Sequence, residues 1–335
     1  MDPAQILLAV MWVGLTLYAV LGGADFGGGF WDLLAGRSGP GMPQRRLIEH
    51  SLGPVWEANH VWLIFVLVVL WTGFPPVFAA VMSTLYIPLT LAAVGIIARG
   101  AAYAFRKSST QLWQQRLFGG AFALSSVLTP FFLGTVAGGI ASGRVPPGLA
   151  EGDLIESWIN PTSLLGGVLA VGVCAYLAAV YLCDDAVRAG LPEMAEAFRR
   201  RALAAALVVG ALALGGIAVL NADAPLLFAG LTGRALPLVL AGAVLGVVSL
   251  LLLRLRRYLL VRGSAVLAVA TVVWGWPMAQ YPYMLPPGTP YRQAAAQPVV
   301  LTTVLVVTAV GALLLIPSIV WLLIIQHRLP YEESH

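Results

Sequence analysis

The residues best suited to chemistry stand together in the short stretch Glu57-Ala58-Asn59-His60. On a helix, Glu57 and His60 lie one turn apart on the same side, and Asn59 lies on an adjacent stripe. A buried carboxylate beside an imidazole can exchange protons near neutral pH, because a low-dielectric site disfavours the charged form of each group. The stretch therefore suits a proton relay. It is equally compatible with a structural pair near a helix N-terminus, where the helix dipole favours a negative side chain.

Two more ionisable residues belong to apolar segments, where an unpaired charge is costly. Asp25 stands in the glycine-rich run 22–29 at the end of the first apolar segment, and Arg99 stands near the end of the third. We expect Asp25, Glu57 and Arg99 to lie at a similar depth and to be able to meet. The alternative for Arg99 is that its long side chain reaches out to the membrane interface. The glycines, which close the apolar segment, are interpreted as helix-packing residues rather than a phosphate-binding loop, which would open a helix after a strand.

The composition sets the class of protein that must position these residues. Of the 335 residues, 59% are hydrophobic and 10% are charged, and the mean hydropathy is +0.88. Soluble domains carry about 25% charged residues, so a cytosolic enzyme, a disordered chain and a nucleic-acid-binding module are excluded. The sequence predicts an all-α polytopic membrane protein, with residues 1–335 as a single integral-membrane domain.

Nine apolar segments of about 20 residues predict nine transmembrane helices. They cover approximately residues 4–23, 55–73, 77–104, 117–139, 162–183, 202–220, 235–253, 259–280 and 298–325. Of the 19 Lys and Arg residues, fourteen fall in the odd-numbered connections and the C-terminal tail, and three fall in the even-numbered connections. Positive residues are retained on the cytoplasmic side, so we expect the N-terminus outside and the C-terminus in the cytoplasm.

Haem or metal binding by this chain is not expected. Of four histidines, only one falls within an apolar segment, so two facing histidines cannot ligate a haem, and there is no Cys-x-x-Cys-His motif. The four are His50, His60, His327 and His335.

Several short motifs follow one another in a characteristic order over nearly the whole chain. They are Ala24-Asp25-Phe26-Gly27-Gly28-Gly29, the block Gly53-Pro54-Val55-Trp56-Glu57-Ala58-Asn59-His60-Val61-Trp62, Phe74-Pro75, Ala98-Arg99-Gly100, Phe105-Arg106, Pro130-Phe131-Phe132-Leu133-Gly134, Asn160-Pro161 and Tyr281-Pro282-Tyr283-Met284-Leu285-Pro286. In this combination the chain resembles the second subunit of the cytochrome bd quinol oxidases, including their cyanide-insensitive relatives.

The resemblance implies two four-helix bundles and one peripheral helix in a bacterial cytoplasmic membrane. It also implies a heterodimer whose other subunit, subunit I, carries two b-type haems, a third haem of d or b type, and the site of quinol oxidation. Such a complex reduces dioxygen to water with cytoplasmic protons. Some relatives have a small single-helix accessory subunit, and membrane lipid surrounds the complex.

The resemblance also bears on single residues. Glu57 matches an acidic position that the family places on a proton pathway, where some members have Asp, and Asp25 and Arg99 match other polar positions. Asn59 and His60 would orient water along that pathway. Some relatives hold a lipid-like quinone as a structural group, and Trp56 and Trp62 would flank it here.

Two other assignments remain open from the sequence. A stand-alone secondary transporter also has many helices with buried polar residues, although here those residues gather at one face rather than at the midplane. A purely structural subunit without a proton role would use the same carboxylates.

Overall fold

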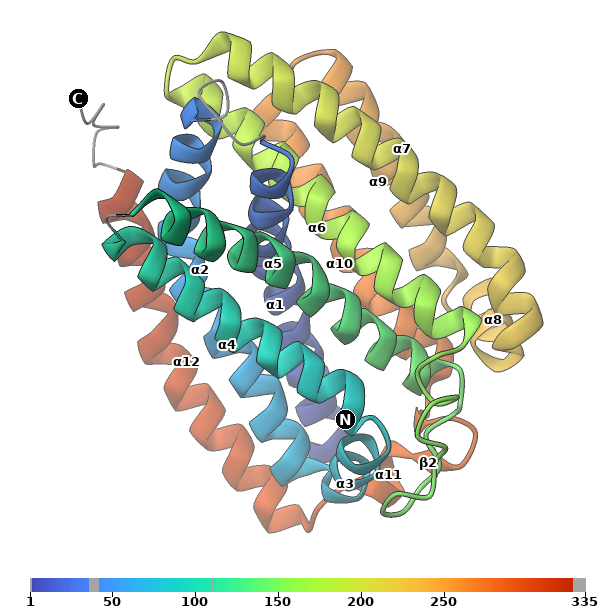
Figure 1. Cartoon of the computed structure of the whole chain (residues 1–335). Coiled ribbons are helices and arrows are strands. Elements are labelled where there is room, and N and C mark those ends of the chain that lie inside the picture. Colours follow the sequence, from blue (N-terminus) through green and yellow to red (C-terminus); the bar gives the residue numbers. More distant parts are fainter. Residues whose placement is uncertain (1, 36–41, 110, 328–335) are drawn as a thin grey trace.

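The computed structural model describes residues 2–35, 42–109 and 111–327, without the side chains of residues 42, 52–58, 107, 108, 112, 319, 320 and 322–327. Nearly all of this part of the chain is helical (Figure 1). The helices are α1 (Pro3–Leu33), α2 (Met42–Gly73), α3 (Pro75–Thr84), α4 (Tyr86–Ser108), α5 (Leu112–Ala141), α6 (Pro161–Arg188), α7 (Pro192–Asp223), α8 (Pro225–Thr232), α9 (Leu236–Arg254), α10 (Tyr258–Gln280), α11 (Tyr291–Ala294) and α12 (Pro298–His327). Strands β1 (Tyr283–Leu285) and β2 (Thr289–Pro290) form a short antiparallel pair.

Helix starts follow local sequence signals. α1 begins after Asp2, whose carboxylate accepts a hydrogen bond of 2.8 Å from the Gln5 amide. α6 begins after Asn160, whose side chain accepts one of 2.9 Å from the Ser163 amide. In both helices proline occupies the first turn, where its missing N–H is not needed.

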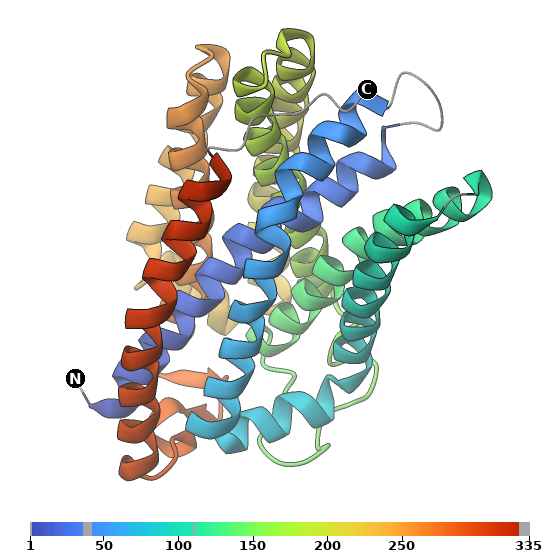
Figure 2. The ribbon, with the colours of Figure 1, turned by 90° about the vertical axis from the view of Figure 1, so that its left-hand side faces the viewer.

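The long helices form two groups. α1, α2, α4 and α5 pack together, and α6, α7, α9 and α10 pack together, with α1 and α5 both contacting α6 where the groups meet. Figures 1 and 2 show α12 at the edge of the first group, where it contacts α1 and α2.

Within the described residues, eight helices are long and apolar enough to cross a membrane, or nine if one bent pair counts as a span. The bend, of 118°, separates residues 59–73 of α2 from α3. The third predicted segment, 77–104, is therefore wrong at its start, because residues 75–84 form α3 and α4 begins only at Tyr86. Pro75 and Pro76 explain the bend between α2 and α3, since proline cannot continue the hydrogen bonding of the preceding helix.

The end predicted for the first segment is also wrong. α1 continues ten residues beyond Gly23 to Leu33, so the glycine run lies inside a helix instead of closing it. The packing interpretation of these glycines is confirmed. A Cβ on Gly27 would lie 1.9 Å from the Cys174 carbonyl oxygen, and a Cβ on Gly23 would lie 2.5 Å from Leu177. The glycines let α1 approach α6 closely, which fixes the position of the neighbouring Asp25.

Candidate functional site

Asp25 and Arg99 form a buried ion pair between α1 and α4. Arg99 Nη2 lies 2.6 Å from Asp25 Oδ1, and Arg99 Nη1 lies 2.7 Å from Asp25 Oδ2. The side chains are 0% exposed for Asp25 and 1% for Arg99. The expectation that Asp25 and Arg99 could meet is confirmed, whereas the side chain of Glu57, the third residue of that expectation, falls outside the described residues. The alternative in which Arg99 reaches the interface is wrong, because two charge-assisted hydrogen bonds hold its guanidinium in the helix group.

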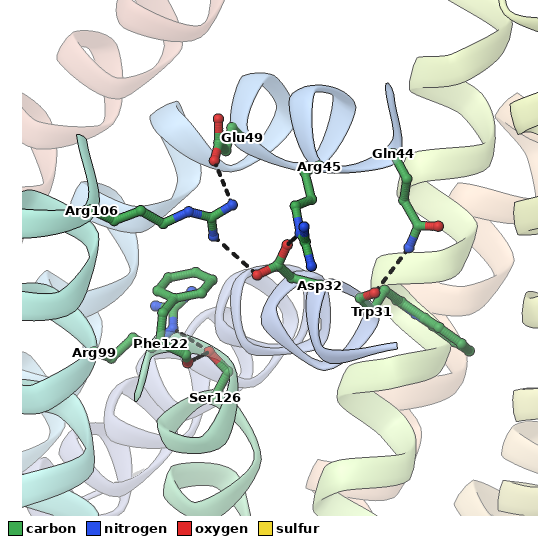
Figure 3. Close-up of polar contacts among 9 residues, drawn as sticks. All are labelled: Trp31, Asp32, Gln44, Arg45, Glu49, Arg99, Arg106, Phe122 and Ser126. Carbon is green, nitrogen blue, oxygen red and sulfur yellow. Dashed lines mark hydrogen bonds and ion pairs between the residues drawn. The ribbon is translucent and has the colours of Figure 1, made fainter. Parts of the chain in front are cut away.

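The rest of the Arg99 guanidinium is also satisfied. Its Nε donates to Ser126 Oγ at 2.8 Å, and its Nη2 donates to the Asp25 carbonyl oxygen at 3.1 Å. The rings of Phe26 and Phe122 lie 4.9 Å and 4.7 Å from the guanidinium carbon. Figure 3 shows Arg99 beside Phe122 and Ser126. Aromatic faces attract a cation and exclude water from it, so the pair is held in a rigid, desolvated site.

Asn59 of α2 also approaches this pair. Its side chain is fully buried, and its Nδ2 lies 3.5 Å from Asp25 Oδ2, a long hydrogen bond. Gly22 makes room for Asn59, since a Cβ there would lie 3.0 Å from the amide. Among the described residues, the amide oxygen of Asn59 has no hydrogen-bond partner, and neither do the buried Tyr18 hydroxyl and Trp62 indole N–H. Buried polar atoms normally have partners, and internal water is a common one.

The remaining predicted site residues lie on α2. The backbone of Trp56 and Glu57 belongs to α2, but the structure does not describe their side chains. His60 is half-buried and follows Asn59. Trp62 makes an edge-to-face contact with Phe65, with ring centroids 6.2 Å apart. The relay between Glu57 and His60 and the quinone contact of Trp56 and Trp62 stay predictions.

A second set of ion pairs, which the sequence analysis missed, joins α1, α2 and α4. Asp32 accepts from Arg45 Nε at 3.1 Å and from Arg106 Nη1 at 3.0 Å, and Arg106 Nη2 lies 3.0 Å from Glu49 Oε1. We call these four residues the Asp32 cluster (Figure 3). The signal was present in the sequence, because Asp32 follows Asp25 by seven residues, and Arg106 follows Arg99 by seven.

A third group of charges, also missed, joins α6 to α10. Arg262 Nη1 lies 3.1 Å from Asp184 Oδ2 and 3.6 Å from Asp185 Oδ1, and its guanidinium carbon lies 4.4 Å from the centre of the Tyr181 ring. A cavity of about 30 Å³ lies beside Arg262, Asp185 and Ser51. That volume accommodates a water molecule.

Within the described part of the chain, no group of three or more His, Cys, Asp or Glu side chains could hold a metal ion. Asp25, Asn59 and Arg99 offer charge and hydrogen bonds rather than a set of metal ligands. Ionisable residues buried inside membrane spans commonly belong to ion or proton pathways.

The fold and this site define an all-helical, multi-pass membrane protein with a carboxylate–guanidinium pair inside one helix group. The family described as "Cytochrome bd terminal oxidase subunit II" matches residues 3–326, and the chain belongs to this family.

Individual relatives agree with this family. The cytochrome bd ubiquinol oxidase subunit 2 of Bacillus subtilis (strain 168) is 30% identical over 172 residues, which cover 50% of this chain and 48% of the relative. The cytochrome bd-I ubiquinol oxidase subunit 2 of Escherichia coli (strain K12) is 28% identical over 189 residues, which cover 53% of this chain and 48% of the relative. The chain thus spans about half the length of the curated relatives that it matches.

A solved structure shares the fold over nearly the whole length. A chain of the bd oxidase from Geobacillus thermodenitrificans superimposes with a TM-score of 0.75 at 24% identity, covering 96% of this chain and 98% of that chain. The two chains therefore share the arrangement of long helices that holds Asp25 and Arg99 together here.

Proposed function

We propose that this chain is the haem-free subunit of a heterodimeric, bd-type quinol oxidase, which couples quinol oxidation to the reduction of dioxygen to water. The observation that carries the proposal is the family match over residues 3–326. The partner is a haem-bearing subunit I with b and d haems, or b haems alone. A small accessory subunit and a structural quinone near Trp56 and Trp62 belong to the same proposal.

The proposed membrane arrangement has nine crossings in a bacterial cytoplasmic membrane, with the N-terminus outside and the C-terminus in the cytoplasm. The bent pair of α2 and α3 would supply the ninth crossing. Figure 2 supports an odd number, because α1 begins at one end of the molecule and α12 ends towards the other. The positive residues of the odd connections support the orientation.

The haems are assigned to the partner because the described part of this chain does not fit one. His60 is the only histidine that the described residues place in a span beside the site, and it has no second histidine opposite it. A stand-alone transporter is not favoured, since the family match covers almost the whole chain.

The proposed contribution of this chain is proton delivery from the cytoplasm. Reduction of dioxygen to water consumes one proton for each electron, so the partner's oxygen site needs a proton supply. Glu57 takes up a proton, and Asn59 and His60 orient the water that carries it along α2. Asp25 supplies a buried carboxylate to the pathway, and Arg99 compensates the negative charge of that carboxylate inside the helix group. The alternative is that these carboxylates only stabilise the fold.

Co-purification tests the assignment to an oxidase. A tagged chain is isolated from its native membrane in mild detergent, and the eluate is examined by reduced-minus-oxidised absorbance and by quinol-dependent oxygen uptake. We expect a second hydrophobic subunit, haem bands and oxygen consumption in the same fraction. A chain that elutes alone, without haem absorbance and without oxygen uptake, would contradict the assignment.

A further inference from the structure

The buried ion pair and the Asp32 cluster are two levels of one ladder between α1 and α4. Asp25 and Asp32 are separated by seven residues on α1, and Arg99 and Arg106 by seven on α4. Seven residues are close to two helical turns and about 10 Å of rise, so each acid and its arginine repeat on the same side of their helices. The ion pairs confirm this register, since each Asp contacts the Arg of its own level.

The exposed fraction of the side chains falls along the ladder from Glu49 to Asp25. The Glu49 side chain is 49% exposed, Arg106 is 20% exposed and Asp32 is 6% exposed, whereas Asp25 is fully buried. In the predicted orientation, the exposed level faces the cytoplasm. Arg106 therefore joins a carboxylate in contact with water, that of Glu49, to one that is almost buried, that of Asp32.

Tyr103 stands between the levels on α4, four residues after Arg99 and three before Arg106. Residues three and four apart share one side of a helix, so Tyr103 lies on the side of α4 that carries Arg99 and Arg106. Its ring packs 6.0 Å from that of Phe122, which covers Arg99. A phenol hydroxyl can donate and accept a hydrogen bond at once, which is what a link between two carboxylate levels requires.

We propose that Glu49 and Asp32 form the cytoplasmic proton-uptake site of this subunit, and that Tyr103 passes the proton on to Asp25. The proposal rests on the proposed function. A proton from water binds Glu49 or Asp32, the Tyr103 oxygen accepts a proton from this level, and its own proton moves towards Asp25. When Asp25 releases that proton to the pathway, each group regains its starting state. Arg106 is a positioning residue, because it holds Glu49 and Asp32 at one point.

The competing explanation is a static contact that only joins α1, α2 and α4. The two explanations predict different turnover for a substitution that deletes one hydroxyl and leaves the packing intact. Tyr103→Phe keeps the ring against Phe122 and removes the transfer group. A static role predicts unchanged turnover for this variant, whereas proton transfer predicts slower turnover.

The experiment uses the purified oxidase complex with Tyr103→Phe, Glu49→Gln and Asp32→Asn. Tyr258→Phe and Glu196→Gln are matched controls at the same predicted side of the second helix group, where Glu196 is likewise ion-paired with arginines. We expect unaltered haem spectra, with turnover reduced about 100-fold in Tyr103→Phe, Glu49→Gln and Asp32→Asn, as for loss of a positioned proton-transfer group, and full turnover in both controls. Acetate or formate should restore the Glu49→Gln variant, because these small acids reach the exposed position of Glu49, and should not restore Asp25→Asn.

The outcomes separate this proposal from the proposed function. Full turnover in Tyr103→Phe and Asp32→Asn, together with slow turnover in Glu57→Ala, would overturn the uptake site and leave the proton role of the subunit standing. Full turnover in all of these variants, including Glu57→Ala and Asp25→Asn, would overturn both. If Asp32→Asn fails to assemble, Tyr103→Phe still decides.

Discussion

Arg99 on α4 holds both carboxylate oxygens of Asp25 on α1, through hydrogen bonds of 2.6 and 2.7 Å at a site where both side chains are buried. An ion pair taken out of water gains little net stability, but removing one partner leaves an uncompensated charge. The pair therefore ties α1 to α4 inside the helix group. This tie between the two helices leads to measurable expectations.

Removing the arginine should destabilise the protein strongly. Arg99→Met leaves Asp25 buried without its counter-charge, and we expect a loss of about 3–5 kcal/mol, seen as a lower melting temperature of the purified complex. Asp25→Asn combined with Arg99→Met removes both charges and should recover part of that loss. Equal melting temperatures for the single and double variants would contradict a coupled pair.

Close packing of α1 on α6 should tolerate no side chain at Gly27. Gly27→Ala places a Cβ 1.9 Å from the Cys174 carbonyl oxygen, so the helices must separate, and we expect a lower yield of assembled protein and a lower melting temperature. Gly246→Ala is the control, because its new Cβ would meet no atom of another described helix within 4 Å and alanine favours a helix by up to about 1 kcal/mol. A melting temperature of Gly27→Ala that is unchanged or raised, as in the control, would contradict the close packing of α1 on α6 at Gly27.

The first turn of α1 should loosen in acid. The backbone N–H of Gln5 is the largest factor that lowers the pKa of Asp2, and Arg292, 3.1 Å away, lowers it further. A lowered folded pKa means that the stabilisation is present above the unfolded value of about 4 and is lost as the pH falls through the folded value. Amide exchange at Gln5 should therefore accelerate in acid beyond the intrinsic change, and Asp2→Asn should abolish that extra acceleration. If amide exchange at Gln5 accelerates in acid by the same amount in Asp2→Asn, Asp2 is excluded as the cause of the extra acceleration.

Hydropathy predicted most of the fold because a run of about 20 apolar residues has few alternatives to a membrane helix. The break at Leu85 was missed because the sequence remains largely apolar from α3 into α4. The length of α1 was missed because glycine weakens an isolated helix, whereas here contact with α6 outweighs that preference.

The site was predicted in part. The similar depth of Asp25 and Arg99 in their two segments indicated that these residues could meet. Depth does not say which side of its helix a residue occupies, so the pairing itself was seen only in the structure. Asp32 was missed because the predicted helix ended at Gly23, which left Asp32 in a connection. Had α1 been extended, the seven-residue spacing of the acids and of the arginines would have predicted the second level.

Proton delivery by this chain is the central claim, and the most direct test is turnover of the assembled complex with Glu57→Ala. Quinol-driven oxygen uptake is measured beside the reduced haem spectrum, with Glu193→Ala as the control, since Glu193 is an acidic residue in the first turn of the distant helix α7. The account predicts turnover slowed by about 100-fold or more, with an unchanged haem spectrum and a fully active control. An unchanged haem spectrum with full turnover in Glu57→Ala would contradict it.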